Sequence, residues 1–144
     1  AMNCANDTEP DAGYPSGMGD ITALAAESFC DVVREHARVQ GDVVAFTYAG
    51  EELSFAELDE GADRVANGLL ALGVKPGDRV AFLGKNHPLY FEAFLGANRI
   101  GAVMTPVNWR LAAPEVAYVL DNSCARVVFV GEGFAEAVSY THLT

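Results

Sequence analysis

Residues 53–83 read LSFAELDEGADRVANGLLALGVKPGDRVAFL, and this stretch decides the fold. Ser54 and Glu57 have the spacing of a capping box, in which the serine hydroxyl accepts a hydrogen bond from the Glu57 amide and the carboxylate reaches back. Gly73 ends the predicted helix, because glycine readily adopts the left-handed conformation that follows a helix. Between these ends, apolar side chains recur along one helical face, at Leu58, Ala62, Val65, Leu69 and Leu72.

The second half of the stretch predicts a turn and a strand. Lys75-Pro76-Gly77-Asp78 places proline and glycine where a type II turn needs them. The apolar run 79–83 then predicts a buried strand. Beyond it, Asn86 is placed to cap a helix from Pro88 to about Ile100. That helix is apolar nearly all round, so we expect it to be buried.

Shorter elements flank this central region. After it, we predict a strand over 102–105 closed by Pro106, a helix over 114–120 and a last strand over 126–130. Before it, a strand over 43–48 and an Ala49-Gly50 turn lead into a short second strand that ends at Leu53. A first helix begins at the N-cap Ser28, with Asp31 in its first turn. Its apolar stripe consists of Phe29, Val32, Val33, His36 and Ala37.

Strands alternate with helices along the chain, which is typical of right-handed βαβ units. We therefore predict an α/β fold with a largely parallel sheet. Residues 1–33 contain six acids and no base, and the segment before Ala23 has few large apolar residues. We expect 1–26 to form a flexible acidic leader and 27–138 to form the folded part.

Composition excludes several functional classes. The chain has 144 residues, 9 Lys+Arg and 20 Asp+Glu, hence a net charge of −11, which disfavours nucleic acid and anionic membrane surfaces as partners. No run approaches the ~18 apolar residues of a transmembrane segment, and we predict no secretory signal. Three scattered cysteines, Cys4, Cys30 and Cys124, favour a reducing cytoplasm over a disulfide framework.

The side chains capable of chemistry form no evident constellation. Cys30 and His36 are six residues apart on one helix and face different directions, and His142 lies near the end of the chain, so a metal site is disfavoured. We expect His36 to be a hydrogen-bonded core residue. A nucleophilic Cys124 with His87 as its base stays open, although a small buried hydrophobe is the commoner role for cysteine.

Two further patterns have simple structural explanations. Gly131-Glu132-Gly133 follows a strand as a dinucleotide fingerprint would, but its third glycine would fall at Glu136, whose size and charge are wrong beside a pyrophosphate. We predict an ordinary strand-to-helix turn there. Glu51 and Glu52 lie beside the hairpin turn, and we expect a solvated tip and not an acid–base pair.

The order of these motifs resembles one known family. Residues 53–58, 72–80 and 106–111 (PVNWRL) strongly resemble the beginning of the adenylate-forming, AMP-binding enzymes, and in particular the acyl-CoA synthetase branch that includes the fatty-acyl-CoA ligases. The similarity covers residues 28 to about 138 without a gap. It further includes Asn86, the segments 91–103 and 118–123, and the strand 126–130.

The resemblance implies an N-terminal fragment of a two-step ligase. Such enzymes use ATP and Mg²⁺ to convert a carboxylic acid, here expected to be a fatty acid, into an acyl-adenylate, and then transfer the acyl group to coenzyme A. The family's phosphate loop, nucleotide-binding motifs, acyl pocket and catalytic lysine all lie downstream of the matching stretch. We therefore assign no catalytic, cofactor-binding or metal-binding residue, expect no bound cofactor, and predict that the fragment is inactive.

Asn108 and Arg110 follow a predicted strand end, where ligand crevices form in α/β folds. The family's core chemistry does not need them, so we expect them to tie the loop.

Alternatives for the whole chain are a non-catalytic binding or scaffold module with the same fold, and a fragment of a peptide-synthetase adenylation domain. The latter usually carries Pro-Leu-Asp-Pro where this chain has residues 106–109.

Two stretches depart from the family pattern. Ala112-Ala113 stands where a Ser or Thr often caps the next helix, and a missing cap costs about 1 kcal/mol. Residues 139–144 match nothing in the family and resemble translated adapter sequence, so we expect a non-native tail. A fragment of this kind should also expose an apolar surface that promotes association.

Overall fold

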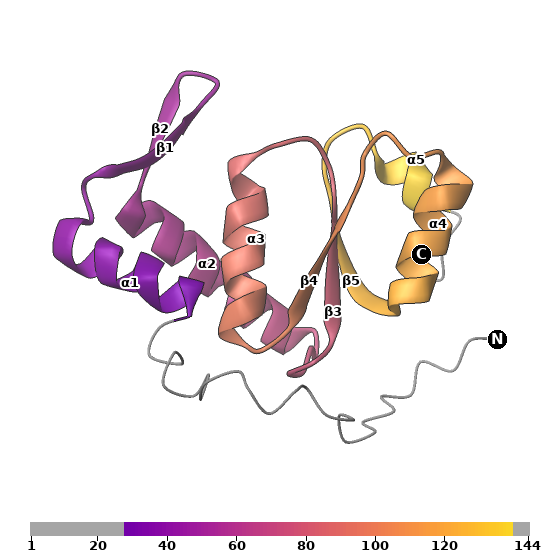
Figure 1. Ribbon diagram of the computed structural model, residues 1–144, viewed down its shortest axis with the longest axis horizontal. Coiled ribbons are helices and arrows are strands. Elements are labelled where there is room, and N and C mark those ends of the chain that lie inside the picture. Colours follow the sequence, from indigo (N-terminus) through magenta and orange to yellow (C-terminus); the bar gives the residue numbers. More distant parts are fainter. Residues whose placement is uncertain (1–27, 140–144) are drawn as a thin grey trace, which may run out of the picture.

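The computed structural model describes residues 28–139 as a parallel sheet with helices on both faces and a separate hairpin (Figure 1). The leader expected at 1–26 and most of the tail expected at 139–144 lie outside the described residues. The helices are α1 (Phe29–Gln40), α2 (Phe55–Ala71), α3 (Pro88–Arg99), α4 (Ala113–Ser123) and α5 (Ala135–Val138). The strands are β1 (Val44–Tyr48), β2 (Glu51–Ser54), β3 (Arg79–Leu83), β4 (Val103–Val107) and β5 (Ala125–Val130).

The three-stranded sheet has the order β4-β3-β5, and both pairings are parallel. The chain moves from β3 through α3 to β4 and then back across β3, through α4, to β5. Right-handed crossovers in opposite directions place their helices on opposite faces. Accordingly, α3 covers one face while α4 and α5 cover the other (Figure 1). The predicted α/β class and parallel sheet are confirmed.

Alternate side chains of β3 enter two different cores, as strand geometry requires. Ala81 and Leu83 pack against Val116 and Leu120 of α4. On the other face, Val80 packs against α2 and α3 together with Leu69, Val74, Ala97 and Ala102. A third core joins α1, α2 and α3 around Cys30, Val33, Leu58, Ala62 and Leu95.

The predicted caps and turns are present. Ser54 and Glu57 form both hydrogen bonds of the capping box, and Ser28 forms a second one with Asp31. Positive φ angles at Gly73 and Gly77 match the predicted helix end and type II turn. The hairpin of β1 and β2 turns through Ala49 and Gly50, both with positive φ, which suits the right-handed twist of the strands.

Two predicted element ends differ from the structure. The N-cap of α3 is His87 and not Asn86, because Pro88 occupies the first helical position and holds the residue before it in an extended conformation. Pro106 does not close its strand. It lies inside β4, which is an edge strand and can lose one backbone donor without breaking a ladder on both sides.

The predicted burial of α1 and α3 is wrong for several side chains. Phe29 was expected on the buried stripe of α1 but is 58% exposed, while its neighbour Cys30 is buried. On α3, Leu89 and Phe91 are exposed, the latter by 45%. The rings of Phe29 and Phe91 contact those of Phe94 and Phe46 but stay about half exposed. Helix α4 is longer than predicted, and no side chain caps it at Ala112.

Candidate functional site

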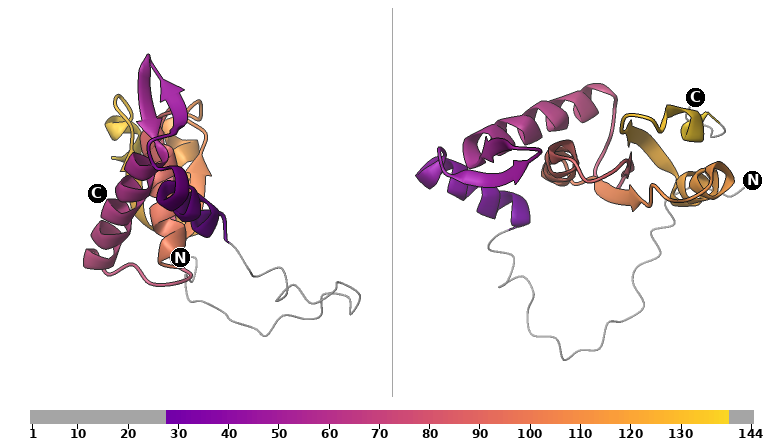
Figure 2. Two further views of the ribbon diagram at one scale, coloured as in Figure 1. Left: turned by 90° about the vertical axis from the view of Figure 1, so that its left-hand side faces the viewer. Right: turned by 90° about the horizontal axis from the view of Figure 1, so that it is seen from above.

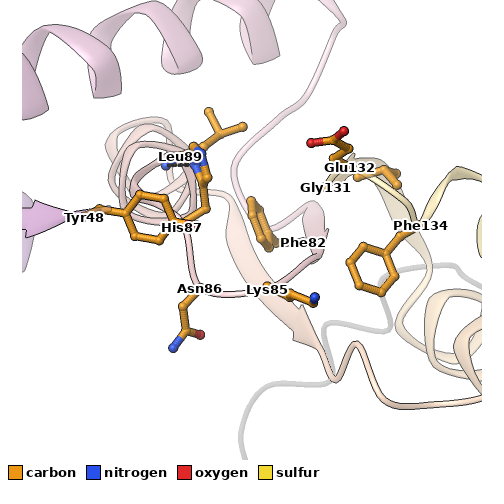
Figure 3. A pocket seen from close by; sticks show the side chains of 10 residues that line it. Tyr48, Phe82, Lys85, Asn86, His87, Leu89, Gly131, Glu132 and Phe134 are labelled. Carbon is orange, nitrogen blue, oxygen red and sulfur yellow. Dashed lines mark hydrogen bonds between the residues drawn. The ribbon is translucent and has the colours of Figure 1, made fainter. Parts of the chain in front are cut away.

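The carboxyl ends of the parallel strands meet at one edge of the sheet, where Leu83 of β3 pairs with Val107 of β4 and Val130 of β5. Ligand crevices of open α/β sheets form at this edge. Two adjoining pockets open there, of about 490 and 450 Å³, and both are lined by Phe82, Lys85 and Asn86. We call the two pockets together the carboxyl-edge hollow, the part of the described chain best placed to contact a ligand (Figure 3).

His87 closes one side of this hollow and serves as the cap of α3. Its Nδ1 accepts a hydrogen bond from the Leu89 amide at 3.1 Å. The ring also packs against the ring of Tyr48, with centroids 5.1 Å apart. Because Nδ1 is the acceptor, the proton of a neutral ring lies on Nε2. His87 therefore holds a helix end and a hairpin, and its basic nitrogen is already engaged.

The open hypothesis of a Cys124–His87 pair is wrong. Cys124 precedes Ala125, which pairs with Arg79 at the amino end of β3. His87 follows Leu83 at the carboxyl end of the same strand. A strand of that length separates the two ends by roughly 13 Å at ~3.3 Å per residue, far beyond hydrogen-bond reach.

Lys85 and Trp109 line the hollow, and Arg110, which is exposed and lies outside this lining, stacks on the Trp109 ring. The Lys85 ammonium lies 5.3 Å from the Trp109 ring centroid, and the Arg110 guanidinium lies 4.3 Å from it. Asn108 Oδ1 accepts a hydrogen bond from the Arg110 amide at 3.0 Å, which ties the turn as expected. In Figure 3 the Lys85 side chain extends toward Phe134, whose ring lies 6.2 Å from that of Trp109.

The glycine turn after β5 forms the opposite wall. The Gly131 amide donates to Leu83 O at 2.8 Å, and a Cβ on Gly131 would lie 3.1 Å from the Gly84 Cα atom. Gly133 has a φ of 83°, and α5 then begins with only four residues. The predicted strand-to-helix turn is thus confirmed. Glu132 lines the hollow, and its carboxylate opposes a phosphate there.

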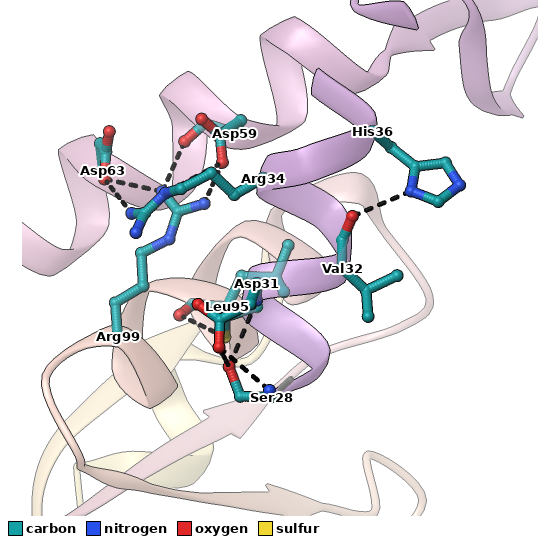
Figure 4. Close-up of polar contacts among 10 residues, drawn as sticks. Ser28, Asp31, Val32, Arg34, His36, Asp59, Asp63, Leu95 and Arg99 are labelled. Atoms are coloured by element: carbon teal, nitrogen blue, oxygen red, sulfur yellow. Dashed lines mark hydrogen bonds and ion pairs between the residues drawn. The ribbon is translucent and has the colours of Figure 1, made fainter. Parts of the chain in front are cut away.

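The polar groups between α1, α2 and α3 serve structure (Figure 4). Arg99 donates to Asp59 O at 2.8 Å and to Asp63 Oδ1 at 2.7 Å, and it also pairs with the Asp59 carboxylate. Arg34 of α1 joins the same carboxylates at 3.5 and 4.0 Å. The Arg99 side chain is only 6% exposed, so this ion-pair network locks three helices together.

The other two candidate side chains are also engaged. His36 Nδ1 donates to Val32 O at 2.9 Å, and its ring packs on Phe55, so it is hydrogen-bonded as predicted, but it is half-buried and not a core residue. The Cys30 thiol donates to Leu95 O at 3.5 Å. Burial raises the pKa of this thiol, which disfavours the reactive thiolate.

The residues of the hollow do not fit a magnesium ion. Within residues 28–139, no three His, Cys, Asp or Glu side chains are grouped so that they could hold a metal. No reaction step through Mg²⁺ is therefore assigned to residues of this chain.

Within residues 28–139, no helix is long and apolar enough to cross a membrane.

No sequence motif predicted the third pocket. It measures about 420 Å³ and lies between α1, the hairpin and α3, and we call it the aromatic groove. Its lining includes Phe29, Phe46, Phe55 and Phe91, and it adjoins the hollow at His87. The all-round apolar character of residues 88–100 was the signal for it, because such a helix needs partners on every side.

The sequence of this chain is similar to those of known enzymes. The sequence profile of the AMP-binding enzyme family matches residues 33–143. Feruloyl-CoA synthase of an Amycolatopsis species is 44% identical over 103 residues, which are 72% of this chain and 21% of that enzyme. The long-chain-fatty-acid–CoA ligase FadD13 of Mycobacterium tuberculosis is 37% identical over 109 residues, covering 74% and 22% respectively.

A solved structure gives the same result for the fold. The N-terminal domain of FACL13 from Mycobacterium tuberculosis superimposes with a TM-score of 0.74 and 35% identity, over 78% of this chain and 29% of that domain. The chain spans about a fifth of the length of the curated relatives it matches. With the family profile matching more than half of its residues, the chain belongs to the AMP-binding enzyme family.

Proposed function

We propose that this chain is the N-terminal part of an ATP-dependent acyl-CoA ligase. The similarity over residues 33–143 to enzymes that form CoA thioesters carries the proposal. In the parent ligase, a substrate carboxylate oxygen attacks the α-phosphate of Mg-ATP, which forms an acyl-adenylate and releases pyrophosphate. The thiol of coenzyme A then attacks the acyl carbon, forms the thioester and releases AMP.

The described residues contribute a scaffold to that reaction. The hollow has a cation at Lys85 but, among residues 28–139, no group of side chains that could hold a metal. We therefore propose that the chain alone forms no adenylate and binds none of the parent's cofactors.

The substrate class is a carboxylic acid, and a fatty acid is our first candidate. FadD13, whose name specifies long-chain fatty acids, supports it. An aromatic acid is the second candidate, because the feruloyl-CoA synthase is more similar, at 44% identity. The acyl pocket of the family lies outside this stretch, so a substrate screen on the longer enzyme decides between them.

Pyrophosphate release tests the proposal. The purified chain, incubated with ATP, Mg²⁺, coenzyme A and either a fatty acid or ferulic acid, should release no pyrophosphate above background. The reading frame extended past residue 138 should encode the Ser/Thr/Gly-rich phosphate loop, and its product should release pyrophosphate with one of the acids. Activity of the short chain would refute its inactivity. A native stop codon with a soluble, cooperatively folded product would favour the scaffold-module alternative.

A further inference from the structure

We propose that His87 makes the amino end of α3 sensitive to pH. The neutral ring caps this helix at the side of the carboxyl-edge hollow, and a protonated ring cannot. Uptake of a proton therefore frees the Leu89 amide and loosens the first turn of α3, which forms one wall of the hollow. This pH response goes beyond the proposed ligase function, because it depends only on contacts within residues 28–139.

The first turn of α3 contains one amide that depends on the ring. Pro88 has no amide hydrogen, and the Tyr90 amide donates to His87 O at 2.9 Å. The Leu89 amide donates instead to His87 Nδ1, at 3.1 Å. An imidazolium has a hydrogen on both nitrogens and accepts no hydrogen bond, so protonation removes this acceptor. The positive end of the helix dipole also repels the added charge.

The contact of His87 with the hairpin responds in the opposite way. Figure 2 shows the hairpin standing apart from the three-stranded sheet, and the ring contact between His87 and Tyr48, at 5.1 Å, links it to the start of α3. A cationic ring is attracted to an aromatic one. Both residues are exposed, so water also solvates the added charge. The protonated ring thus stays on the hairpin and leaves the helix without its cap.

The groups that face His87 include one cation and one carboxylate. On the side of the hollow, the charged lining residues are Lys85, which opposes protonation, and Glu132, which favours it. Tyr48 faces the ring from β1, and a tyrosine phenol is neutral where histidine titrates. On the other side, the lining of the aromatic groove contains no Asp, Glu, Lys or Arg. Imidazole rings ordinarily take up a proton near pH 6.5, so a comparison of about pH 7.5 with about pH 5.5 brackets the change.

The loosened turn carries two side chains of the hollow. Leu89 lines one of its pockets and Tyr90 lines the other. The Tyr90 ring packs edge-on against Phe82, with centroids 5.2 Å apart, and Phe82 lines both pockets. Fraying of this turn therefore changes the shape of the hollow while the strands of the sheet stay in place.

Amide exchange provides the first test. In the isotope-labelled chain, solvent-exchange NMR compares the protection factor of the Leu89 amide with that of the Glu57 amide, whose acceptor is the Ser54 hydroxyl and does not titrate in this range. From pH 7.5 to pH 5.5, Leu89 should lose roughly fivefold in protection relative to Glu57, the effect of one N-cap hydrogen bond. The loss should have the same midpoint as the shift of the His87 Cε1 proton. An unchanged ratio, or different midpoints, would overturn the proposal.

Two histidine variants provide the second test. His87→Asn keeps an acceptor at the cap but takes up no proton, so its Leu89 amide should be equally protected at both pH values. His36→Gln is the matched control. His36 Nδ1 donates to Val32 O at 2.9 Å, a bond that a charged ring also forms, so this variant should keep the fivefold change.

The two variants also separate the cap from a general loosening in acid. A pH response that persists in His87→Asn, or that disappears in His36→Gln, would contradict the role of His87. Far-ultraviolet circular dichroism at both pH values shows whether each variant is folded. If His87→Asn does not fold, the matched midpoints of His87 and the Leu89 amide in the unaltered chain still decide.

Discussion

The two sides of α3 differ in how their apolar residues are used. Toward the parallel sheet, the helix buries Ala97 against Val80 of β3 and Ala102, with almost no surface exposed. Toward the hairpin, the same helix leaves Phe91 45% exposed in the aromatic groove. Both sides consist of apolar residues, so hydrophobicity alone does not distinguish them.

The difference is the position of the partner along the chain. Each helix beside the sheet returns over a strand that is adjacent to it in sequence, so the described residues contain both halves of the interface. Among residues 28–139, no element covers the open side of the groove. An apolar pattern therefore shows that a face needs a partner, but it does not show that the partner lies within the same stretch.

The largest expected effect comes from a fully closed core, the one on the face of β3 opposite to α3. Leu83→Ala removes a side chain that is 0% exposed in β3 and leaves a cavity between the sheet and α4. We expect a loss of about 3 kcal/mol in the free energy of unfolding, measured by urea titration. Phe91→Ala should cost less than about 1 kcal/mol in the same chain, because its ring is already half exposed. Equal losses of stability in Leu83→Ala and Phe91→Ala would mean that the closed core and the groove do not differ.

A glycine pair tests the junction of α2 and α3. A Cβ on Gly96 would lie 2.6 Å from Val65 Cγ1 and 2.8 Å from Ala62 O, so the backbones must separate. A Cβ on Gly61 would meet only the side chain of Glu92, which can move away. We expect Gly96→Ala to destabilise by about 2 kcal/mol. Gly61→Ala should instead be neutral or stabilising by up to about 1 kcal/mol, through helix propensity.

Urea midpoints of the two glycine variants, measured side by side, decide this prediction. Both changes add one methyl group to a helix, so intrinsic propensity cancels in the comparison. A Gly96→Ala variant as stable as Gly61→Ala would show that the close approach of α2 and α3 is not maintained in solution.

Features set by neighbouring residues were predictable from the sequence. The Ser54–Glu57 box, the Gly73 helix end and the Gly77 turn involve residues at most a few positions apart, and the structure has all three. The parallel order followed from the alternation of strands and helices. The crevice position of Asn108 followed from the end of β4, whereas Arg110 lies outside the lining of the hollow.

Features that depend on distant packing were not predictable. Phe29 and Cys30 are adjacent, and only the placement of α1 against Leu95 decides which one is buried. Pro106 can lie within β4 because the strand is at the sheet edge, and that order is a property of the whole sheet. The edge of the sheet at which the hollow opens followed from the strand ends, while the aromatic groove required the arrangement of α1, the hairpin and α3.

Low pH should weaken the Ser54–Glu57 capping box, which joins the hairpin to α2. Hydrogen bonds from the Ser54 amide and hydroxyl lower the pKa of the Glu57 carboxyl. A lowered folded-state pKa means that the stabilisation is fully present above the ordinary value near 4.5 and is lost as the pH falls through the lowered one. The urea midpoint should therefore fall less between pH 7 and pH 3 in Glu57→Gln than in the unaltered chain.

Removal of the Ser54 hydroxyl measures how much the N-cap of α2 contributes to the free energy of unfolding. Ser54→Ala should cost about 1 kcal/mol at pH 7, since it leaves the Glu57 amide without its acceptor. The loss should appear in the same urea titrations. An identical pH dependence of Glu57→Gln and the unaltered chain would show that the box does not form in solution.

The smallest expected effect is a gain at α4. Glu115 accepts a hydrogen bond from the Ala112 amide at 2.8 Å, so one half of a capping box is present, but Ala112 has no oxygen to return it. Ala112 already has the extended conformation of a cap, with φ −67° and ψ 154°. Ala112→Ser should thus stabilise the chain by about 0.5 kcal/mol, because the hydroxyl gives the Glu115 amide a second acceptor beside Ala112 O, to which it already donates at 2.9 Å. Glu115→Gln combined with Ala112→Ser should keep most of this gain, whereas Ala112→Val should give none.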